Sequence, residues 1–212
     1  FINRVPHLSF VWGEEDVTFL RKRYEAMRRH AQFSDMQFSD DPDVLRQWMP
    51  LVMAQRDVSQ PVAATRVEHG SDIDFGALTR GMVETLKRQP NFNLLLEHSV
   101  RSLEQDKHGH WHVHVHDRAS NKSKTFVSRF VFLGAGGGAL PLLQKSGIPE
   151  SKGYGGFPVS GQWLICNDPE IVQQHHAKVY GKAPLGAPPM SVPHLDTRII
   201  NGQRALLFGP YA

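Results

Sequence analysis

The sequence predicts a mixed α/β (α+β) protein, because segments with helical periodicity alternate with segments that have the character of strands. The strongest signal lies in residues 129–147, where the apolar run 130–133 leads into four glycines and then into a short helical pattern. An apolar run without alternation is typical of a strand covered on both faces, as in a parallel sheet. Residues 92–127 contain three further strand-like runs, which predict an antiparallel meander.

The glycines between residues 134 and 138 predict a loop whose backbone approaches a phosphate or pyrophosphate group. Glycine has no Cβ atom, so its backbone can adopt positive φ and come close to a ligand. The N–H groups at the start of the following helix would point toward the same ligand. Gly134, Gly136 and Ala139 match the relaxed dinucleotide pattern G-x-G-x-x-A. A tight strand-to-helix turn without a ligand is the alternative.

Composition limits the class of protein. The 212 residues are 40% hydrophobic and 21% charged, which suits one large globular domain or two modest ones. The 24 basic and 21 acidic residues are interspersed, so no nucleic-acid-binding patch is predicted. Cys166 is the only cysteine, which excludes an intramolecular disulfide. Because the chain starts at Phe1 and ends just after an apolar run, we interpret it as a segment of a longer protein.

The N-terminal third predicts two strands and two helices. Residues 5–13 form a strand pattern, and three acidic residues then begin a helix that basic residues close at 28–30. A short helix is expected over 42–48, and a second strand over 63–68. The first helix has an apolar face that predicts a core stripe. This stripe consists of Val17, Leu20, Tyr24, Met27 and Ala31.

A longer helix is predicted over residues 71–89, with Asp72 or Asp74 as its N-cap and Pro90 as its end. Its apolar face would consist of Phe75, Leu78, Met82 and Leu86. The meander follows, with strands expected over 92–98 and its continuation to 103, then 111–115 and 125–127.

The middle strand of the meander carries a row of histidines on one face. Histidine binds soft transition metals, and successive side chains on a strand face lie about 7 Å apart. A functional site also needs fixed partners for the ligands, and only Asp117 lies nearby in the sequence. We therefore predict a solvated strand face and no metal site. The row consists of His110, His112, His114 and His116, with His108 preceding it.

Several long strings, in order along the chain, resemble bacterial malate:quinone oxidoreductases. The resemblance covers essentially the whole chain. The order of helix, meander, apolar run and glycine loop also resembles flavoproteins of the D-amino-acid oxidase and glycerol-3-phosphate dehydrogenase type. The strings are FVFLGAGGGALPLLQKSGIPE, GFPVSGQWL, AKVYGKAPLGAPPMSVPHLDTR and LLFGPYA, with VPHLSFVWGEEDVTFL and PLVMAQRD before them.

The resemblance implies an FAD enzyme that oxidises the C2 hydroxyl of (S)-malate to oxaloacetate and passes electrons to membrane quinone without NAD. It implies a peripheral location at the cytoplasmic face of the bacterial inner membrane. The family's N-terminal G-x-G-x-x-G strand and its C-terminal flavin-binding part are absent from these residues. FAD is therefore expected in the full-length protein but not in this segment alone.

The resemblance also implies a D-amino-acid-oxidase-like fold with a partial, Rossmann-like FAD-binding domain. Residues 1–66 and 159–212 would belong to a substrate domain, and residues 67–158 to the FAD-binding domain. Val100 would lie against the adenine. The cofactor's pyrophosphate would lie near the loop Gly134, Ala135, Gly136 and Gly137.

Oxidation of malate requires a cationic clamp for two carboxylates and a base for the hydroxyl proton. The guanidinium of arginine pairs bidentately with carboxylates, and histidine titrates near working pH. Within VPHLDTR, we predict His194 as the base and Arg198 as the clamp; a structural histidine in a turn is the alternative for His194. The two residues need not share a face if the segment is irregular. His7 and Arg66 are weaker candidates.

Two other functions remain open at this point. One is a non-catalytic nucleotide-binding module that uses the loop at 134–139. The other is a metal-binding histidine strand, which a stoichiometric, chelator-sensitive metal signal would support.

Overall fold

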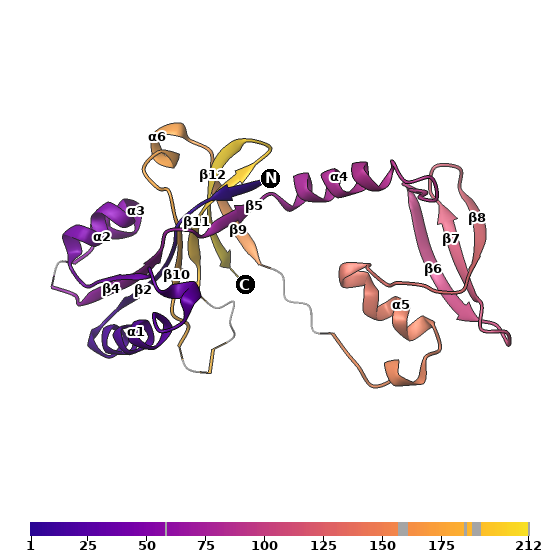
Figure 1. Ribbon diagram of the computed structural model, residues 1–212, viewed down its shortest axis with the longest axis horizontal. Coiled ribbons are helices and arrows are strands. Elements are labelled where there is room, and N and C mark those ends of the chain that lie inside the picture. Colours follow the sequence, from indigo (N-terminus) through magenta and orange to yellow (C-terminus); the bar gives the residue numbers. More distant parts are fainter. Residues whose placement is uncertain (58, 157–160, 185, 188–191, 212) are drawn as a thin grey trace. The chain divides into compact units, whose positions relative to one another are not determined.

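The computed structural model describes residues 1–57, 59–156, 161–184, 186–187 and 192–211. The chain forms two compact units, shown in Figure 1. Unit 1 consists of Phe1–Thr85 together with Val159–Ala212, and unit 2 consists of Leu86–Pro158. Unit 1 is therefore built from two separate stretches of chain, with unit 2 inserted between them.

Unit 1 is organised around a seven-stranded sheet with the order β3-β4-β2-β10-β11-β12-β9. The pair β2–β10 is parallel, and every other pair in this sheet is antiparallel. The central pairing therefore joins the N-terminal stretch of the chain to the C-terminal stretch. The strands are β2 (His7–Trp12), β3 (Gln37–Ser39), β4 (Val62–Val67), β9 (Gln162–Cys166), β10 (Lys178–Gly181), β11 (His194–Ile200) and β12 (Gln203–Tyr211).

A separate antiparallel ribbon pairs β1 (Ile2–Arg4) with β5 (Ser71–Ile73). Asp74 follows β5 and caps helix α4 (Phe75–Leu86), because its carboxylate accepts a hydrogen bond of 2.9 Å from the Ala77 N–H. The ribbon thus places Asp72 in a strand and Asp74 at a helix start.

Helices cover both faces of the seven-stranded sheet. Helix α1 (Glu14–Met27) inserts Leu20 between Val11 and Ala63 on the face that we call the α1 face. On the other face, here the α2–α3 face, Leu45 and Met49 pack over the strands from α2 (Pro42–Trp48) and the loop before α3 (Pro50–Met53). The strand side chains beneath them are Leu8, Phe10, Val62, Ala64 and Val179.

Local sequence explains where these helices begin. The first turn of α1 contains Glu14, Glu15 and Asp16, and negative charge is favourable at a helix N-terminus. Helix α2 starts at Pro42, and the Asp41 carboxylate accepts a hydrogen bond of 2.8 Å from the Asp43 N–H. The short helix α6 (Pro169–Val172) repeats this arrangement with Asp168 as its cap.

Unit 2 is a three-stranded antiparallel meander with the order β6-β7-β8. The strands are β6 (His98–Gln105), β7 (Trp111–Asp117) and β8 (Lys122–Ser128). In the turn after β7, the Asp117 carboxylate accepts hydrogen bonds from the Ser120 hydroxyl and from the N–H groups of Ser120 and Ala119, which lower its pKa to about 2. Helix α5 (Ala139–Lys145) follows, and the short 3-10 turns are η1 (Ala31–Phe33), η2 (Gly136–Gly138) and η3 (Pro149–Ser151).

Several predictions from the sequence are confirmed. The strand at 5–13, the helix starting at Glu14, the helix over 42–48 and the strand near 63–68 all occur with bounds within a few residues. The second and third strands of the meander are present and antiparallel. In the predicted stripe of α1, Leu20 is buried, whereas Ala31 lies beyond the helix and is exposed.

The prediction of a buried strand over 130–133 was wrong. These residues form no strand, and the exposed fractions of Phe130 and Phe132 are 74% and 82%. A strand requires a neighbouring backbone to accept its hydrogen bonds. Within the described part of the chain, no strand pairs with this run, so its apolar character alone does not make it a strand.

Two further predictions need correction. Residues 92–97 precede the meander as irregular chain, and its first strand starts only at His98. The helix predicted over 71–89 spans Phe75–Leu86, because residues 71–73 pair with β1 as a strand. Its predicted apolar face is not packed: Phe75, Met82 and Leu86 are exposed.

Candidate functional site

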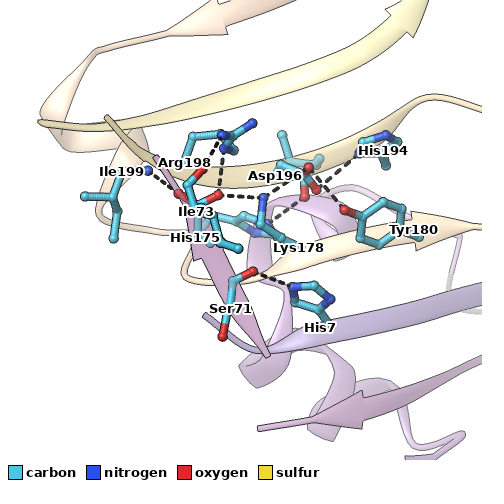
Figure 2. A network of polar contacts seen from close by, with 12 residues as sticks. His7, Ser71, Ile73, His175, Lys178, Tyr180, His194, Asp196, Arg198 and Ile199 are labelled. Carbon is cyan, nitrogen blue, oxygen red and sulfur yellow. Dashed lines mark hydrogen bonds and ion pairs between the residues drawn. The ribbon is translucent and has the colours of Figure 1, made fainter. Parts of the chain in front are cut away.

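The predicted residues His194 and Arg198 lie on the same strand and the same face. Both belong to β11, whose alternation places His194, Asp196 and Arg198 on the α1 face of the sheet. Figure 2 shows these three side chains together with Lys178 and Tyr180 of β10. The segment is regular strand, so the sequence argument that the two residues need not share a face does not apply here.

His194 is held between two aromatic rings and a carboxylate. Its imidazole centroid lies 4.4 Å from the Tyr180 ring and 4.9 Å from the Trp163 ring, which meets it edge-on. The distance from Nδ1 to the Asp196 Oδ1 atom is 3.2 Å, and the side chain is 17% exposed. Among described residues, neither of these two atoms has an aligned hydrogen bond, so their approach is a close polar contact and not a hydrogen bond. The Nε2 atom has no partner in the described part of the chain.

Gly209 makes room for the Trp163 ring beside His194. The residue lies opposite His194 in the β11–β12 register and has φ of +151°. A Cβ atom at this position would lie 3.2 Å from the Trp163 ring and 2.8 Å from the Gln162 carbonyl oxygen. Glycine is therefore required for this close packing.

A buried ion network lies next to His194. The Lys178 ammonium lies between two carboxylates, with Nζ 3.0 Å from Asp72 Oδ1 and 3.4 Å from Asp196 Oδ2. The Arg198 Nε atom is 2.6 Å from Asp72 Oδ1. Asp72 is 1% exposed and Asp196 4%. Two cations thus balance two carboxylates, which is the condition under which charges are tolerated in a protein interior.

Backbone groups complete the network. The Asp72 Oδ2 atom accepts a hydrogen bond of 2.7 Å from the Ile199 N–H. The Arg198 Nη2 atom donates to the Ile73 carbonyl oxygen at 3.1 Å. Through these contacts the ribbon strand β5 is attached to the edge of β11, although Asp72 and Ile199 are far apart in the sequence.

Burial sets the protonation of two neighbouring groups. Desolvation and the adjacent Asp196 charge raise the pKa of Tyr180 to about 12, so its hydroxyl stays neutral and donates to Asp196 Oδ2 at 3.4 Å. Burial lowers the pKa of His175, whose Nε2 lies 3.4 Å from the Leu195 carbonyl oxygen. Neither group adds a charge to the network near neutral pH.

Arg198 is positioned differently from the sequence prediction of an open clamp. Its Nε atom forms the ion pair with Asp72 without an aligned hydrogen bond, and its Nη2 atom donates to the Ile73 carbonyl oxygen. The remaining Nη1 atom has no partner among the residues described. Arg198 therefore has one free edge for a substrate carboxylate, and its main contact is with Asp72.

An apolar cavity of about 530 Å³ opens where β11 begins, and His194 borders it. Arg56 is its only basic side chain besides His194 among the described lining residues; its guanidinium carbon lies 4.8 Å from the Phe10 ring centroid. The cavity can hold a largely apolar molecule of this size and offer it the guanidinium of Arg56. Its walls are formed mainly by Phe10, Trp12, Leu51, Val52, Val179, Pro193, Leu195 and Phe208.

The predicted cofactor-binding residues lie in unit 2. Val100 is on β6 next to a register shift in the β6–β7 pairing and is 38% exposed. Gly134 and Ala135 are exposed and lead into η2, which begins with the equally exposed Gly136 and Gly137 and continues into α5. Gly136 has φ of +54°, and a Cβ atom there would meet no other atom within 4 Å. The open backbone of this loop fits the approach of a phosphate group.

The weaker candidates and the histidine row have mainly structural contacts. His7 packs against Gly70, and its Nε2 lies 3.1 Å from the Ser71 carbonyl oxygen. Arg66 lies on the opposite face of the sheet from His194. In the meander, His112 contacts Asp106 and His114 contacts Thr125 and Glu104. No group of three potential metal ligands occurs among the described residues.

Sequence reasoning missed three members of the site. Asp196 stands two positions after His194, and strand alternation would have placed it on the same face. Lys178 interrupts an apolar strand pattern, which is a signal for a paired buried charge. Asp72 was considered only as a helix cap, and nothing in its local sequence indicates a contact with β10 and β11.

The whole chain, residues 1–212, matches the family described as malate:quinone oxidoreductase (Mqo). The chain belongs to the malate:quinone oxidoreductase family. It is 66% identical to a probable malate:quinone oxidoreductase from Hahella chejuensis over all 212 residues, which is 43% of that protein. The identity is 65% to the relative from Methylobacillus flagellatus, again over 43% of its length, and 58% to the relative from Gluconobacter oxydans, over 42%.

Family membership helps to decide between the alternative functions that the sequence left open. The chain spans less than half the length of these curated malate:quinone oxidoreductases. Their names support an oxidoreductase and give no support to a non-catalytic nucleotide-binding module. None of the described helices combines the length and apolar character that crossing a membrane requires.

The network generates a stability prediction. Replacing Lys178 by Met leaves the Asp196 carboxylate buried without its cation, so the free energy of unfolding should fall by about 3–5 kcal/mol. Urea unfolding of the 212-residue chain measures this change. The matched control is Lys182→Met, which removes an ion pair with Asp16 whose side chains are 28% and 35% exposed, and it should cost about 1 kcal/mol or less. Equal losses in the two variants would show that the network contributes no special stability.

Proposed function

We propose that this chain forms part of an FAD-dependent dehydrogenase that oxidises (S)-malate to oxaloacetate and passes the electrons to membrane quinone. Its family and the names of its relatives support the two substrates. The observation that carries the proposal is the His194–Asp196 pair, a histidine that lies beside a buried carboxylate and whose second ring nitrogen has no partner among the described residues. This arrangement suits a group that removes a proton from a hydroxyl.

Oxidation of the C2 hydroxyl removes a proton from oxygen and a hydride from carbon. In the proposal, Nε2 of His194 accepts the hydroxyl proton. The Asp196 Oδ1 atom lies 3.2 Å from Nδ1 without an aligned hydrogen bond, and its charge would favour a proton on Nδ1 and stabilise the positive charge that the ring gains. The Trp163 and Tyr180 rings pack against the imidazole and restrict its rotation.

Arg198 is proposed to bind a substrate carboxylate through its free Nη1 edge. Its contact with Asp72 holds the guanidinium plane in place, so little side-chain entropy would be lost on binding. Lys178 has both of its carboxylate partners within the network and is proposed to serve the structure of the site.

We propose a D-amino-acid-oxidase-like arrangement in which residues 1–66 and 159–212 belong to a substrate domain and residues 67–158 to an FAD-binding domain. The interleaving of unit 1 and unit 2 along the chain supports such an order. The two boundaries differ in one place: the proposed substrate domain ends at residue 66, whereas the first stretch of unit 1 continues to Thr85.

The backbone of Gly134–Gly137 would hold the FAD pyrophosphate, and Val100 would contact the adenine. The open, positive-φ backbone at Gly136 supports this placement. FAD, when bound, supplies the acceptor for the hydride.

The apolar cavity beside His194 is proposed to receive the quinone ring. Its walls are aromatic and aliphatic, and the Arg56 Nε atom is buried there without a hydrogen-bond partner among the described residues. That N–H group could donate to a quinone carbonyl oxygen. A peripheral position at the cytoplasmic face of the inner membrane would give the cavity access to membrane quinone, and this location is part of the proposal.

The base is tested in a full-length enzyme in which residues 1–212 replace the matching region of the Hahella chejuensis relative. His194→Asn should lower the malate-dependent rate of flavin reduction by about 10²-fold or more, because the proton acceptor is lost. Stopped-flow absorbance at saturating malate measures this rate. His7→Asn is the matched control and should keep it. A His194→Asn enzyme that reduces its flavin at the parent rate would make His194 structural.

Arg198 is tested in the same enzyme by Arg198→Lys, which keeps the charge and loses the planar fork. The dissociation constant for malate should rise, and the rate at saturating malate should change less than in His194→Asn. The malate dependence of the stopped-flow rate separates these two quantities. If the dissociation constant for malate and the urea midpoint are both unchanged, Arg198 does not bind the substrate, and its role is limited to the ion pair with Asp72.

The glycine loop is tested by Gly136→Val, again in the full-length enzyme. A β-branched side chain resists positive φ and would project where phosphate must approach, so the flavin content after gel filtration should fall. Gly153→Val is a control, since Gly153 also has positive φ and open surroundings but lies beyond α5. Full flavin content in Gly136→Val would remove this loop from the cofactor site.

A further inference from the structure

A second cavity, of about 460 Å³, lies at the end of the α2–α3 face away from the apolar cavity. The apolar cavity contacts the end of β2 at Trp12, whereas this one contacts the chain just before β2, at Val5 and Pro6. Its polar character distinguishes it from the core cluster that lies between the two. We refer to it as the arginine cavity, after Arg4, Arg66 and Arg204 in its lining.

The arginine cavity carries an excess of positive charge. Three guanidinium groups line it, and Glu68 is the single carboxylate among its described lining residues. The Glu68 Oε2 atom pairs with Arg66 at 2.6 Å. Arg204 donates a hydrogen bond of 2.8 Å to the His176 Nδ1 atom. The acceptor is an uncharged ring nitrogen, so this contact does not neutralise the guanidinium charge. Arg4 has no hydrogen-bond or ion-pair partner in the described part of the chain.

Arg66 is fixed in the wall of this cavity. Its side chain is 25% exposed, and the guanidinium carbon lies 5.6 Å from the Trp48 ring centroid. Its Nε atom is buried and has no hydrogen-bond partner among the described residues. A desolvated donor of this kind is costly unless it is paired, and an anion in the cavity would supply a partner.

The cavity is separate from the site at His194. Ala177 and Thr197 line the arginine cavity. Ala177 directly precedes Lys178 of the buried network, and Thr197 directly follows Asp196. Because side chains alternate along a strand, the network and the cavity lie on opposite faces of the sheet. The carboxylates of the network therefore do not neutralise the arginines of the cavity by direct contact.

We propose that the arginine cavity binds a small anion that carries two or more carboxylate or phosphate groups. Guanidinium groups pair with both kinds of oxyanion through two parallel hydrogen bonds. The three arginines come from three different strands, β1, β4 and β12, so one charged group on the ligand would pair with only part of the site. The site is distinct from the proposed malate site, and its existence does not depend on that proposal.

The test is calorimetric titration of the 212-residue chain with citrate and with pyrophosphate, at constant ionic strength and above the ordinary pKa range of histidine. At least one probe should bind saturably at millimolar or lower concentration, while acetate should not. Binding of citrate alone identifies a carboxylate ligand, and binding of pyrophosphate alone identifies a phosphate ligand. The absence of saturable binding by both probes, or equal binding of acetate, would overturn the proposal.

Variants locate the binding. Arg204→Gln and Arg4→Gln change exposed side chains. Each should raise the dissociation constant of the probe that binds by about tenfold, the loss expected for one charge-assisted pair. Arg29→Gln is the control, since it removes the same charge from an exposed position after α1. Urea midpoints check that all three variants fold. A loss in Arg29→Gln as large as in Arg204→Gln would show general charge attraction and refute a site in this cavity.

Discussion

The ammonium of Lys178, placed between the carboxylates of Asp72 and Asp196, connects three parts of the chain that are far apart in sequence. Asp72 belongs to the ribbon strand β5, and the other two residues to neighbouring strands of the main sheet. Charges this deeply buried are tolerated only when each has its partner. The network therefore favours the arrangement in which β5, β10 and β11 meet, and the position of His194 follows from that arrangement.

The same alternation that buries the network separates the chemistry of unit 1 into two faces. The α1 face has His194 with its carboxylate partner, and the α2–α3 face has the apolar and arginine cavities at its two ends. Because His194 stands at the start of β11, it borders the apolar cavity while its ring contacts Tyr180 and Trp163. In the proposal, the group that accepts the hydroxyl proton therefore also borders the cavity for an apolar acceptor.

How much could be predicted from the sequence depended on the range of the interactions involved. Helices α1 and α2 and strands β2 and β7 were predictable because capping, periodicity and alternation are local properties. The apolar run 130–133 failed as a strand because its state depends on a neighbouring backbone, which its own residues do not encode. Residues 71–73 were assigned to a helix for the same reason: their pairing with β1 bridges about 70 residues of chain.

The candidate site shows the same limit. His194 and Arg198 were selected for the chemistry that malate oxidation requires, and Asp196 was within reach of the alternation rule. Lys178 could be recognised only as a charge in an apolar strand, and its partner Asp72 carried no signal, since only the folded sheet brings the two together. Their discovery changes the interpretation of Arg198, which a sequence argument treats as a free cation and the structure shows paired with Asp72.

The central claim is that Asp196 holds the His194 ring with its proton on Nδ1 and leaves Nε2 free to accept a proton. Nitrogen-15 NMR of the histidine-labelled 212-residue chain reports this tautomer directly, with His194→Gln identifying the signal. We predict that the Nδ1–H form predominates and that Asp196→Asn reduces its share. A predominant Nε2–H form that Asp196→Asn leaves unchanged would contradict the account.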